Sequence, residues 1–289
     1  DSYNVAVGYE AGNDITTGIQ NTIMGSYAGD ALTTGSDNVV MGYAALSNPN
    51  AGNRSIAIGS SALNAQNAGS AGQNMYNTGV GYNAGGSMTT GTFNTLIGGL
   101  TGDAVTTGHH NIAIGYSALS TEDGNGYNIA IGSYALQDQN AGADAYNIAI
   151  GHNAGKEVST GVQNTIVGGL SGDALTTGAG NTVLGYQALS AEDTHGRNTA
   201  IGFNALLVQD AGADGYNTAV GYQAGLAINT GVRNSILGYA GKALTTGSEN
   251  VAIGYLTMNA GTTGGKNVAV GTEALTANLL GSRNVAVGQ

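Results

Sequence analysis

A short pattern, Asn-x-apolar-aliphatic-Gly, recurs seventeen times in this chain, and its spacing constrains the fold more than any other feature. The copies begin at residues 4, 21, 38, 55, 77, 94, 111, 128, 147, 164, 181, 198, 217, 234, 250, 267 and 284. Twelve of the sixteen spacings are 17 residues; the first position is Asn in every copy except Ser55, and the fifth is always Gly. Helical repeats need a longer period, and Gly is too frequent for stable helices. The pattern predicts an all-β chain, a parallel β-solenoid (β-roll) of about seventeen coils.

The alternation of side chains along a strand assigns faces to the pattern, with the Asn counted as position 1. Positions 2 and 4, such as Ile148 and Ile150, are expected to point into the coil, and positions 1, 3 and 5 outward. Stacked coils then align the Asn side chains in a hydrogen-bonded ladder. Gly at position 5 permits a sharp corner. The second recurring run, apolar-Thr-Thr-Gly as at 105–108, is expected to form the opposite strand and its turn.

A longer period groups the coils in fours. Position 9 reads Gly, Gly, Leu, Leu in the first three groups; the fourth reads Gly225, Gly241, Met258 and Leu275, with Gly241 one place early because its coil has 16 residues. The expected organisation is one solenoid over 1–289, with blocks 4–76, 77–146, 147–216 and 217–283, and 284–289 beginning a further coil. At a strand spacing of ~4.8 Å this solenoid would be roughly 80 Å long. No capping segment is visible at either end, so we expect a window of a longer chain or copies stacked end to end.

Composition excludes several classes of protein. The chain has 51 Gly but 1 Pro, which excludes collagen, and 41% apolar residues, which argues against disorder. No apolar run is long enough for a membrane helix. A net charge of −11 makes nucleic acid an unsuitable partner, because phosphate contacts need clustered Lys and Arg. With 0 Cys, disulfides and thiol catalysis are excluded.

Several copies, including NVAVGYEAG, NIAIGYSAL and NTAVGYQAG, resemble the head repeats of trimeric autotransporter adhesins and similar repeats of phage tail fibres. The resemblance covers nearly the whole chain, although the coil is longer than the usual coil of that family. It implies a left-handed parallel β-roll with three chains side by side. It also implies an adhesive or spacer segment that is extracellular, at the cell surface or on a virion, with a cell-surface glycan as a candidate partner.

Position 3 suggests self-association, as a homotrimer or a filament. It is apolar or Gly in all seventeen copies, although the assignment above turns it outward, and an outward apolar face calls for a covering layer. A second layer of the same chain is the alternative. Partner chains are favoured, which makes the larger side chains at this position the expected oligomer interface: Ile23, Val40, Leu96, Ile166, Val183 and Ile236.

Two kinds of ligand contact are considered beside assembly. Long acidic turns offer oxygen ligands to calcium through Asp138, Asn140, Asp144, Asp210 and Asp214, although ordinary solvated turns are favoured, and no cofactor is expected. Recurring tyrosines suit contact with a glycan, although packing at a corner is favoured: Tyr9, Tyr82, Tyr116, Tyr186, Tyr222 and Tyr255.

Catalysis and ice binding have weaker support. The four His residues fall at different coil positions with no recurring Ser or carboxylate, so no enzyme is expected. The Thr-Thr pairs are largely missing from the third and fourth coils of each block, which is a poor match to a regular ice-binding array. The sequence therefore favours a structural or adhesive fibre segment, with a glycan- or calcium-binding module as the alternative.

Overall fold

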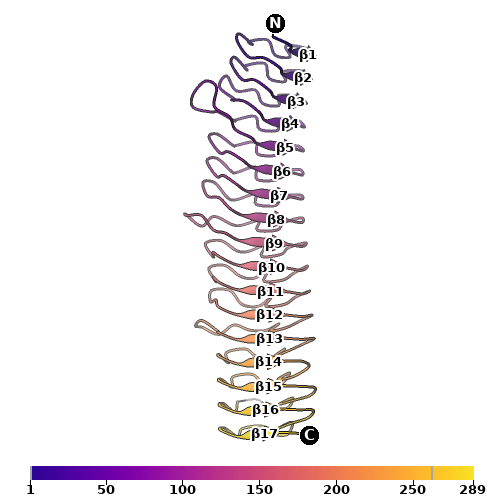
Figure 1. Ribbon diagram of the computed structural model, residues 1–289, viewed down its shortest axis with the longest axis vertical. Coiled ribbons are helices and arrows are strands. Elements are labelled where there is room, and N and C mark those ends of the chain that lie inside the picture. The colour runs from indigo at the N-terminus through magenta and orange to yellow at the C-terminus, as the bar shows by residue number, and fades with distance from the viewer. Residues whose placement is uncertain (1, 262) are drawn as a thin grey trace. The chain divides into compact units, whose positions relative to one another are not determined.

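The computed structural model describes residues 2–261 and 263–289, in which every strand belongs to the same repeating coil (Figure 1). Each strand has three residues and covers positions 2 to 4 of one copy of the pattern. The strands are β1 (Val5–Val7), β2 (Thr22–Met24), β3 (Val39–Met41), β4 (Ile56–Ile58), β5 (Thr78–Val80), β6 (Thr95–Ile97), β7 (Ile112–Ile114), β8 (Ile129–Ile131), β9 (Ile148–Ile150), β10 (Thr165–Val167), β11 (Thr182–Leu184), β12 (Thr199–Ile201), β13 (Thr218–Val220), β14 (Ser235–Leu237), β15 (Val251–Ile253), β16 (Val268–Val270) and β17 (Val285–Val287).

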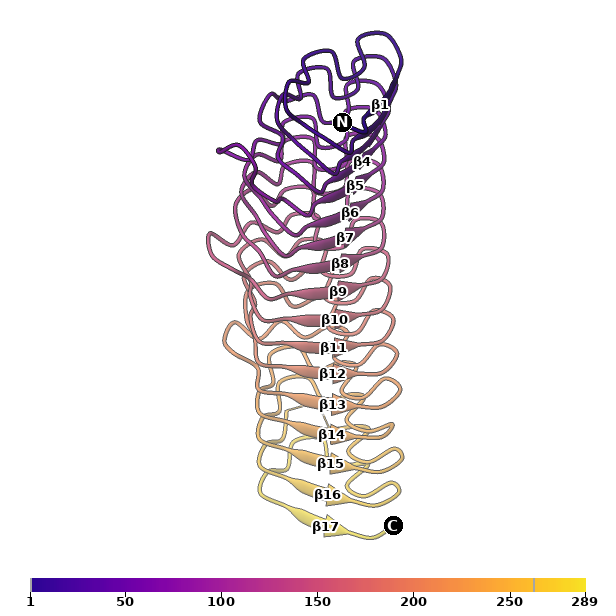
Figure 2. The same ribbon diagram turned by 45° about the horizontal axis from the view of Figure 1, so that its top comes forward.

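The chain forms two compact units, Asp1–Tyr146 and Asn147–Gln289. Their boundary coincides with the boundary between the second and third sequence blocks. Unit 1 contains β1 to β8, and unit 2 contains β9 to β17. Within each unit, successive strands pair in parallel and in register, as where Ile166 of β10 lies beside Val183 of β11 (Figure 2). The predicted all-β parallel solenoid, with about seventeen coils and a spacing of about 17 residues, is confirmed.

The assignment of strand faces from the sequence is wrong. The middle residue of each strand points into the coil, and its two neighbours point outward, as in β10, where Ile166 is buried and Thr165 and Val167 are not. Alternation holds, but its phase is shifted by one residue. Position 3 is therefore core and not an interface. The side chains expected there are 0% or 2% exposed within the single chain: Ile23, Val40, Leu96, Ile166, Val183 and Ile236.

The physical reason is that the Asn at position 1 also turns inward. Asn164 is 0% exposed, its backbone N–H donates to Oδ1 of Asn147 at 2.8 Å, and its Nδ2 donates to the carbonyl of Gly178 at 2.9 Å. Positions 1 and 3 share one face of a strand, so the buried ladder also turns position 3 inward. The predicted Asn ladder is present, inside the coil. It satisfies backbone groups that would otherwise be buried without partners.

The four-coil period reflects the packing of the coil interior. Where position 9 is Gly, a large apolar residue occupies position 12, as with Gly225 and Ile228. A Cβ on Gly225 would lie 2.8 Å from Ile228 Cδ1, so the two positions compete for the same space. Where position 9 is Leu, position 12 is polar in the second and third blocks, as with Leu206 and Gln209, both 0% exposed. Each of these coils therefore receives one large apolar side chain from one of the two positions.

Close stacking explains the invariant Gly at position 5. Gly168 has a φ of 136°, and a Cβ on it would lie 2.5 Å from the carbonyl oxygen of Gly185 in the next coil. Any side chain would separate the coils. The apolar-Thr-Thr-Gly run is not the strand expected from the sequence. In the described chain it forms turns whose N–H groups donate to the next coil, as Thr89 N does to the carbonyl of Thr106 at 2.8 Å.

Candidate functional site

The outward side chains at positions 2 and 4 form an apolar surface on each unit, which we call the strand strip. Position 4 is aliphatic in all seventeen strands, position 2 is aliphatic, Thr or Ser, and neither position carries a charge. In unit 2, Leu184 is 47% exposed and Leu237 is 49% exposed. Other side chains of the strip, such as Ile131 and Val167, are half-buried. The strip is therefore the apolar face that the sequence had placed at position 3.

A second column runs along the corner formed by the residues that precede each Asn. All of them have a positive φ, between 49° and 68°. In unit 1 the rings of Tyr76, Phe93, His110, Tyr127 and Tyr146 stack in order, with adjacent centroids 4.9 to 5.1 Å apart and interplanar angles of 4 to 17°. Each inner ring is covered on both faces by its neighbours, so this column presents ring edges to solvent.

The tyrosines considered as an alternative glycan contact lie at position 6 and are exposed. Tyr9 and Tyr82 are each 63% exposed, and the four others range from 47 to 58%: Tyr116, Tyr186, Tyr222 and Tyr255. Several contact the ring of an adjacent coil. Tyr222 stacks on Phe203 at 5.4 Å and 11°, which occupies a face that a sugar would need. Glycan contact at these residues stays a prediction, and packing between coils accounts for the stacked pairs.

In the acidic turns considered as an alternative calcium site, Asp144 and Asp214 make internal contacts. Asp144 Oδ1 accepts the N–H of Gly126 at 3.1 Å, and Asp214 Oδ1 accepts that of Gly196 at 3.1 Å. Asp214 Oδ2 also pairs with Arg197. Asp138, Asn140 and Asp210 lie on the same lengthened turns as these residues. In the described chain, the one group of three acidic or His side chains close enough to share a metal lies elsewhere, at Glu192, Asp193 and His195.

Glu192 is a buried carboxylate that the sequence reasoning had treated as part of a solvated turn. It occupies position 12, is 0% exposed, and its Oε2 has no hydrogen-bond partner. Burial raises its pKa to about 7, against the opposing effects of the His195 N–H bond and the His195 charge. Glu122 is the equivalent residue one block earlier, and burial raises its pKa too. The signal was available, because position 12 holds a large apolar side chain in several other coils, such as the buried Leu32 and Leu175.

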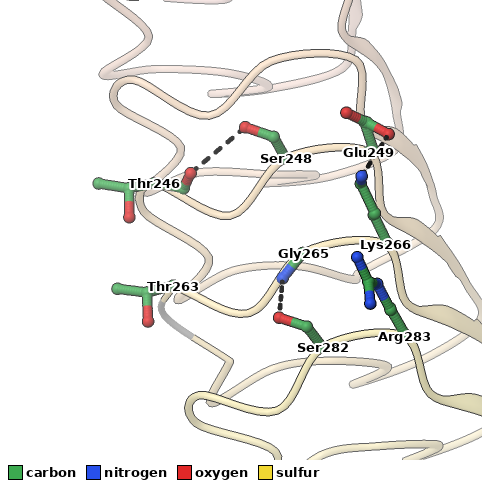
Figure 3. A pocket seen from close by; sticks show the side chains of 8 residues that line it. All are labelled: Thr246, Ser248, Glu249, Thr263, Gly265, Lys266, Ser282 and Arg283. Carbon is green, nitrogen blue, oxygen red and sulfur yellow. Dashed lines mark hydrogen bonds and ion pairs between the residues drawn. The ribbon is translucent and has the colours of Figure 1, made fainter.

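The clearest concave site is an open groove in unit 2 with a volume of about 560 Å³ (Figure 3). We call it the basic groove. Its cations are Lys266 and Arg283, and its one acid is Glu249. Lys266 Nζ and Arg233 NH1 each lie 3.9 Å from the Glu249 carboxylate. The remaining lining is mostly hydroxyl-bearing: Thr246, Ser248, Thr263, Gly265 and Ser282.

The charge of the chain is unevenly distributed around this groove. Residues 215–289 hold four Lys or Arg and two Asp or Glu, whereas residues 1–214 hold three Lys or Arg and sixteen Asp or Glu. The groove therefore lies in a segment of net charge +2 within a chain of net charge −11. The sequence reasoning used the whole-chain charge and missed this segment. A count of charges per block finds it.

The Thr hydroxyls bear on the ice-binding alternative. Thr106 Oγ1 donates to the carbonyl of Asp123 at 2.6 Å, and Thr176 Oγ1 donates to that of Asp193 at 2.8 Å. The same bond joins Thr89 to Thr106 at 3.1 Å. These hydroxyls hold adjacent coils together and so donate along the solenoid instead of to an external water lattice.

A scan against protein-family models found no match to this chain, and neither did a search of the curated proteins. Within residues 2–261 and 263–289 there is also no helix of the length and hydropathy that a membrane span requires. The regular coil and its repeat define the chain as a β-solenoid repeat protein.

Proposed function

We propose that the chain is a structural, repetitive fibre segment whose copies associate side by side through the strand strip. The observation that carries this proposal is an uncharged surface on each unit in which position 4 of every strand is aliphatic and position 2 is aliphatic, Thr or Ser. Single exposed apolar residues are ordinary, but a contiguous apolar patch marks an interaction surface. The resemblance to adhesin head repeats and phage tail-fibre repeats supports an extracellular, cell-surface or virion setting and a homotrimer or filament.

A second copy of the chain is the occupant that best matches the strip. Its side chains recur at the spacing of stacked strands, ~4.8 Å, and only a surface with the same spacing keeps its ridges and grooves in step over many coils. The strip lacks charges, which excludes a partner that binds through ion pairs. The same strip on a second, parallel copy of the chain has both the matching spacing and the absence of charge.

The area that a stable interface buries sets how many strands of the strip must take part. Nine strands at ~4.8 Å and a width of about 10 Å give roughly 400 Å² per partner for unit 2. A stable interface buries about 800 Å² per partner. Unit 2 alone falls short, so an interface through the strip needs more strands than this unit supplies. We therefore expect association to depend on the length of the solenoid.

The experiment is light scattering coupled to size-exclusion chromatography. Leu184→Asp combined with Leu237→Asp places two charges in the strip of unit 2 and should release monomers that retain the wild-type circular dichroism spectrum. The matched control is Leu279→Asp with Leu280→Asp, because these leucines are 54% and 72% exposed but lie outside the strip. The control should leave the molecular mass of the wild-type assembly unchanged. A monomeric wild type, or equal dissociation by both pairs, would refute the proposal.

A further inference from the structure

The basic groove is built by three successive coils of unit 2 and uses no side chain of the strand strip. Its volume is about 560 Å³, and it is open to solvent along its length. Lys266 and Arg283 occupy the same corner position of adjacent coils, with φ of 60° and 62°, and so project from equivalent backbone geometry. Figure 3 shows Arg283 beside Lys266 on one wall of the groove. The repeat thus places two cations side by side.

The charges of this wall are only partly neutralised. Glu249 is shared between Arg233 and Lys266, with both contacts at 3.9 Å, and Arg283 makes no ion pair with any described residue. The side chains of Lys266 and Arg233 are 53% and 63% exposed, so binding an anion would not require breaking a buried pair. An arginine can also hold a carboxylate through two parallel N–H bonds. The wall is suited to one carboxylate group.

The rest of the groove lining carries hydroxyl groups. Ser282 Oγ accepts the N–H of Gly265 at 3.1 Å, which leaves the hydroxyl proton directed to another acceptor. Ser248 Oγ accepts the N–H of Val232 at 3.1 Å in the coil before. Thr246 and Thr263 add two further hydroxyls to the lining. The Glu249 carboxylate accepts hydrogen bonds only. Among the described residues that line the groove there is no aromatic or large aliphatic side chain, so a planar or apolar ligand has none of them to pack against.

We propose that the basic groove binds a carboxylate-bearing saccharide, a uronic acid unit of an acidic glycan. Lys266 and Arg283 hold the carboxylate, Ser282 donates to a sugar oxygen, and Glu249 accepts from sugar hydroxyls. An acidic peptide would also satisfy the two cations but would carry fewer hydroxyl groups to donate to Glu249, so it is the competing ligand in the test below. The positive charge of residues 215–289 also attracts an anionic polymer to this part of an otherwise acidic chain.

The test is isothermal titration of the full chain with a trigalacturonate probe at low ionic strength. The wild type should bind trigalacturonate and show no heat with maltotriose, its neutral counterpart. Lys266→Gln with Arg283→Gln should weaken binding at least tenfold, and Ser282→Ala should weaken it several-fold. The matched control is Arg197→Gln, which removes a cation from the same corner column one block earlier, outside the groove; binding should stay within twofold of the wild type.

Three results would overturn the proposal. One is the absence of binding to trigalacturonate by the wild type. Another is an equal loss of affinity in the Arg197→Gln control, which would show attraction to the net charge of the column and not to a site. The third is that triglutamate binds as tightly as trigalacturonate, which would assign the groove to acidic peptides. The comparison of trigalacturonate with maltotriose and triglutamate uses only the wild-type protein, so it does not depend on whether a variant folds.

Discussion

Asn147 and Asn164 lie one above the other in adjacent coils, and Oδ1 of Asn147 accepts the backbone N–H of Asn164 at 2.8 Å. The contact repeats one coil further, where Asn164 Oδ1 accepts the N–H of Asn181 at 2.9 Å. Asn164 also donates from Nδ2 to the carbonyl of Gly178. Asn164 thus satisfies backbone groups of two coils, whereas at Asn198 only the Oδ1 contact is made and Nδ2 is buried without a partner. The ladder accounts for the near-invariance of Asn at position 1.

Replacing Asn164 with Ala should destabilise the solenoid by roughly 2–4 kcal/mol, because the N–H of Asn181 and the carbonyl of Gly178 would be buried without partners. Thermal unfolding followed by circular dichroism measures the loss. Asn13→Ala is the control, since the Asn13 side chain is exposed and donates to the exposed Asp14 side chain, and the change should alter stability by less than about 0.5 kcal/mol. An Asn164→Ala protein as stable as this control would contradict the role of the ladder.

Ser55, the one exception, shows how the ladder tolerates a shorter side chain. Gln66, from position 12 of the same coil, donates to Ser55 Oγ at 3.0 Å and accepts from Nδ2 of Asn77 at 2.9 Å. The sequence predicted the ladder but not this replacement. Spacing alone cannot show that a residue eleven positions away turns inward to complete it.

The phase of the strand is the part of the fold that the sequence reasoning got wrong. Both phases give alternation, and both place aliphatic residues on two faces, so the pattern at positions 3 and 4 does not choose between them. Position 2 does carry a signal, because it is Thr or Ser in eight copies, as at Thr165, whereas position 3 is never polar. That difference identifies position 3 as the buried one. The inward Asn was less accessible to reasoning, because a buried polar residue requires its partners to be known.

With the corrected phase, the substitution expected to be costly is at position 3 and not at position 4 of the strand. Ile150 is 37% exposed and lies in the strip, so Ile150→Asn should cost less than about 1 kcal/mol in the dissociated chain. Ile166 is fully buried, and Ile166→Asn should cost on the order of 3 kcal/mol or more, because an unpaired amide replaces core packing. Urea unfolding of the two variants measures the difference. Equal losses would restore the inward assignment of position 4.

The competition between positions 9 and 12 predicts a coupling that can be measured. Gly225→Leu alone should destabilise by about 1–3 kcal/mol, because Leu would overlap Ile228. Ile228→Gln in the same chain reproduces the Leu206 and Gln209 pair of the preceding coil and should recover about 1 kcal/mol or more. A double-mutant cycle in urea gives the coupling energy. Strict additivity of the two changes would show that the positions do not share one space.

Glu192 predicts a pH dependence of stability. Its pKa is raised from 4.5 to about 7 in the folded chain, so the folded state holds a proton that the unfolded state has already released. Stability from this group is full below pH 4.5, falls as pH rises toward 7 and is level above, with a total loss of up to about 3 kcal/mol. Glu192→Gln should flatten the profile between these values, and Asp193→Asn, at an exposed neighbour, should not. An unchanged slope in Glu192→Gln would contradict the assignment.

The candidate sites were harder to predict than the fold. Aromatic and acidic residues were chosen by type, but Tyr222 has a ring face covered by Phe203, and the Asp214 carboxylate is held by Arg197 and Gly196. The basic groove depends on side chains from three coils, which are neighbours only because the period places them in register. Charge per block would have indicated the segment, but not that Lys266 and Arg283 share a wall.

The central claim, that the strand strip joins copies of the chain, is tested most directly by a distance between copies. The chain has 0 Cys, so Val167→Cys introduces a single site for a spin label on the strip. Pulsed electron–electron double resonance on the assembled protein should give a short, narrow distribution of intermolecular distances for this label. A label at Leu280→Cys, which lies off the strip, should give no such distribution. A narrow distance at Leu280→Cys with none at Val167→Cys would contradict the account.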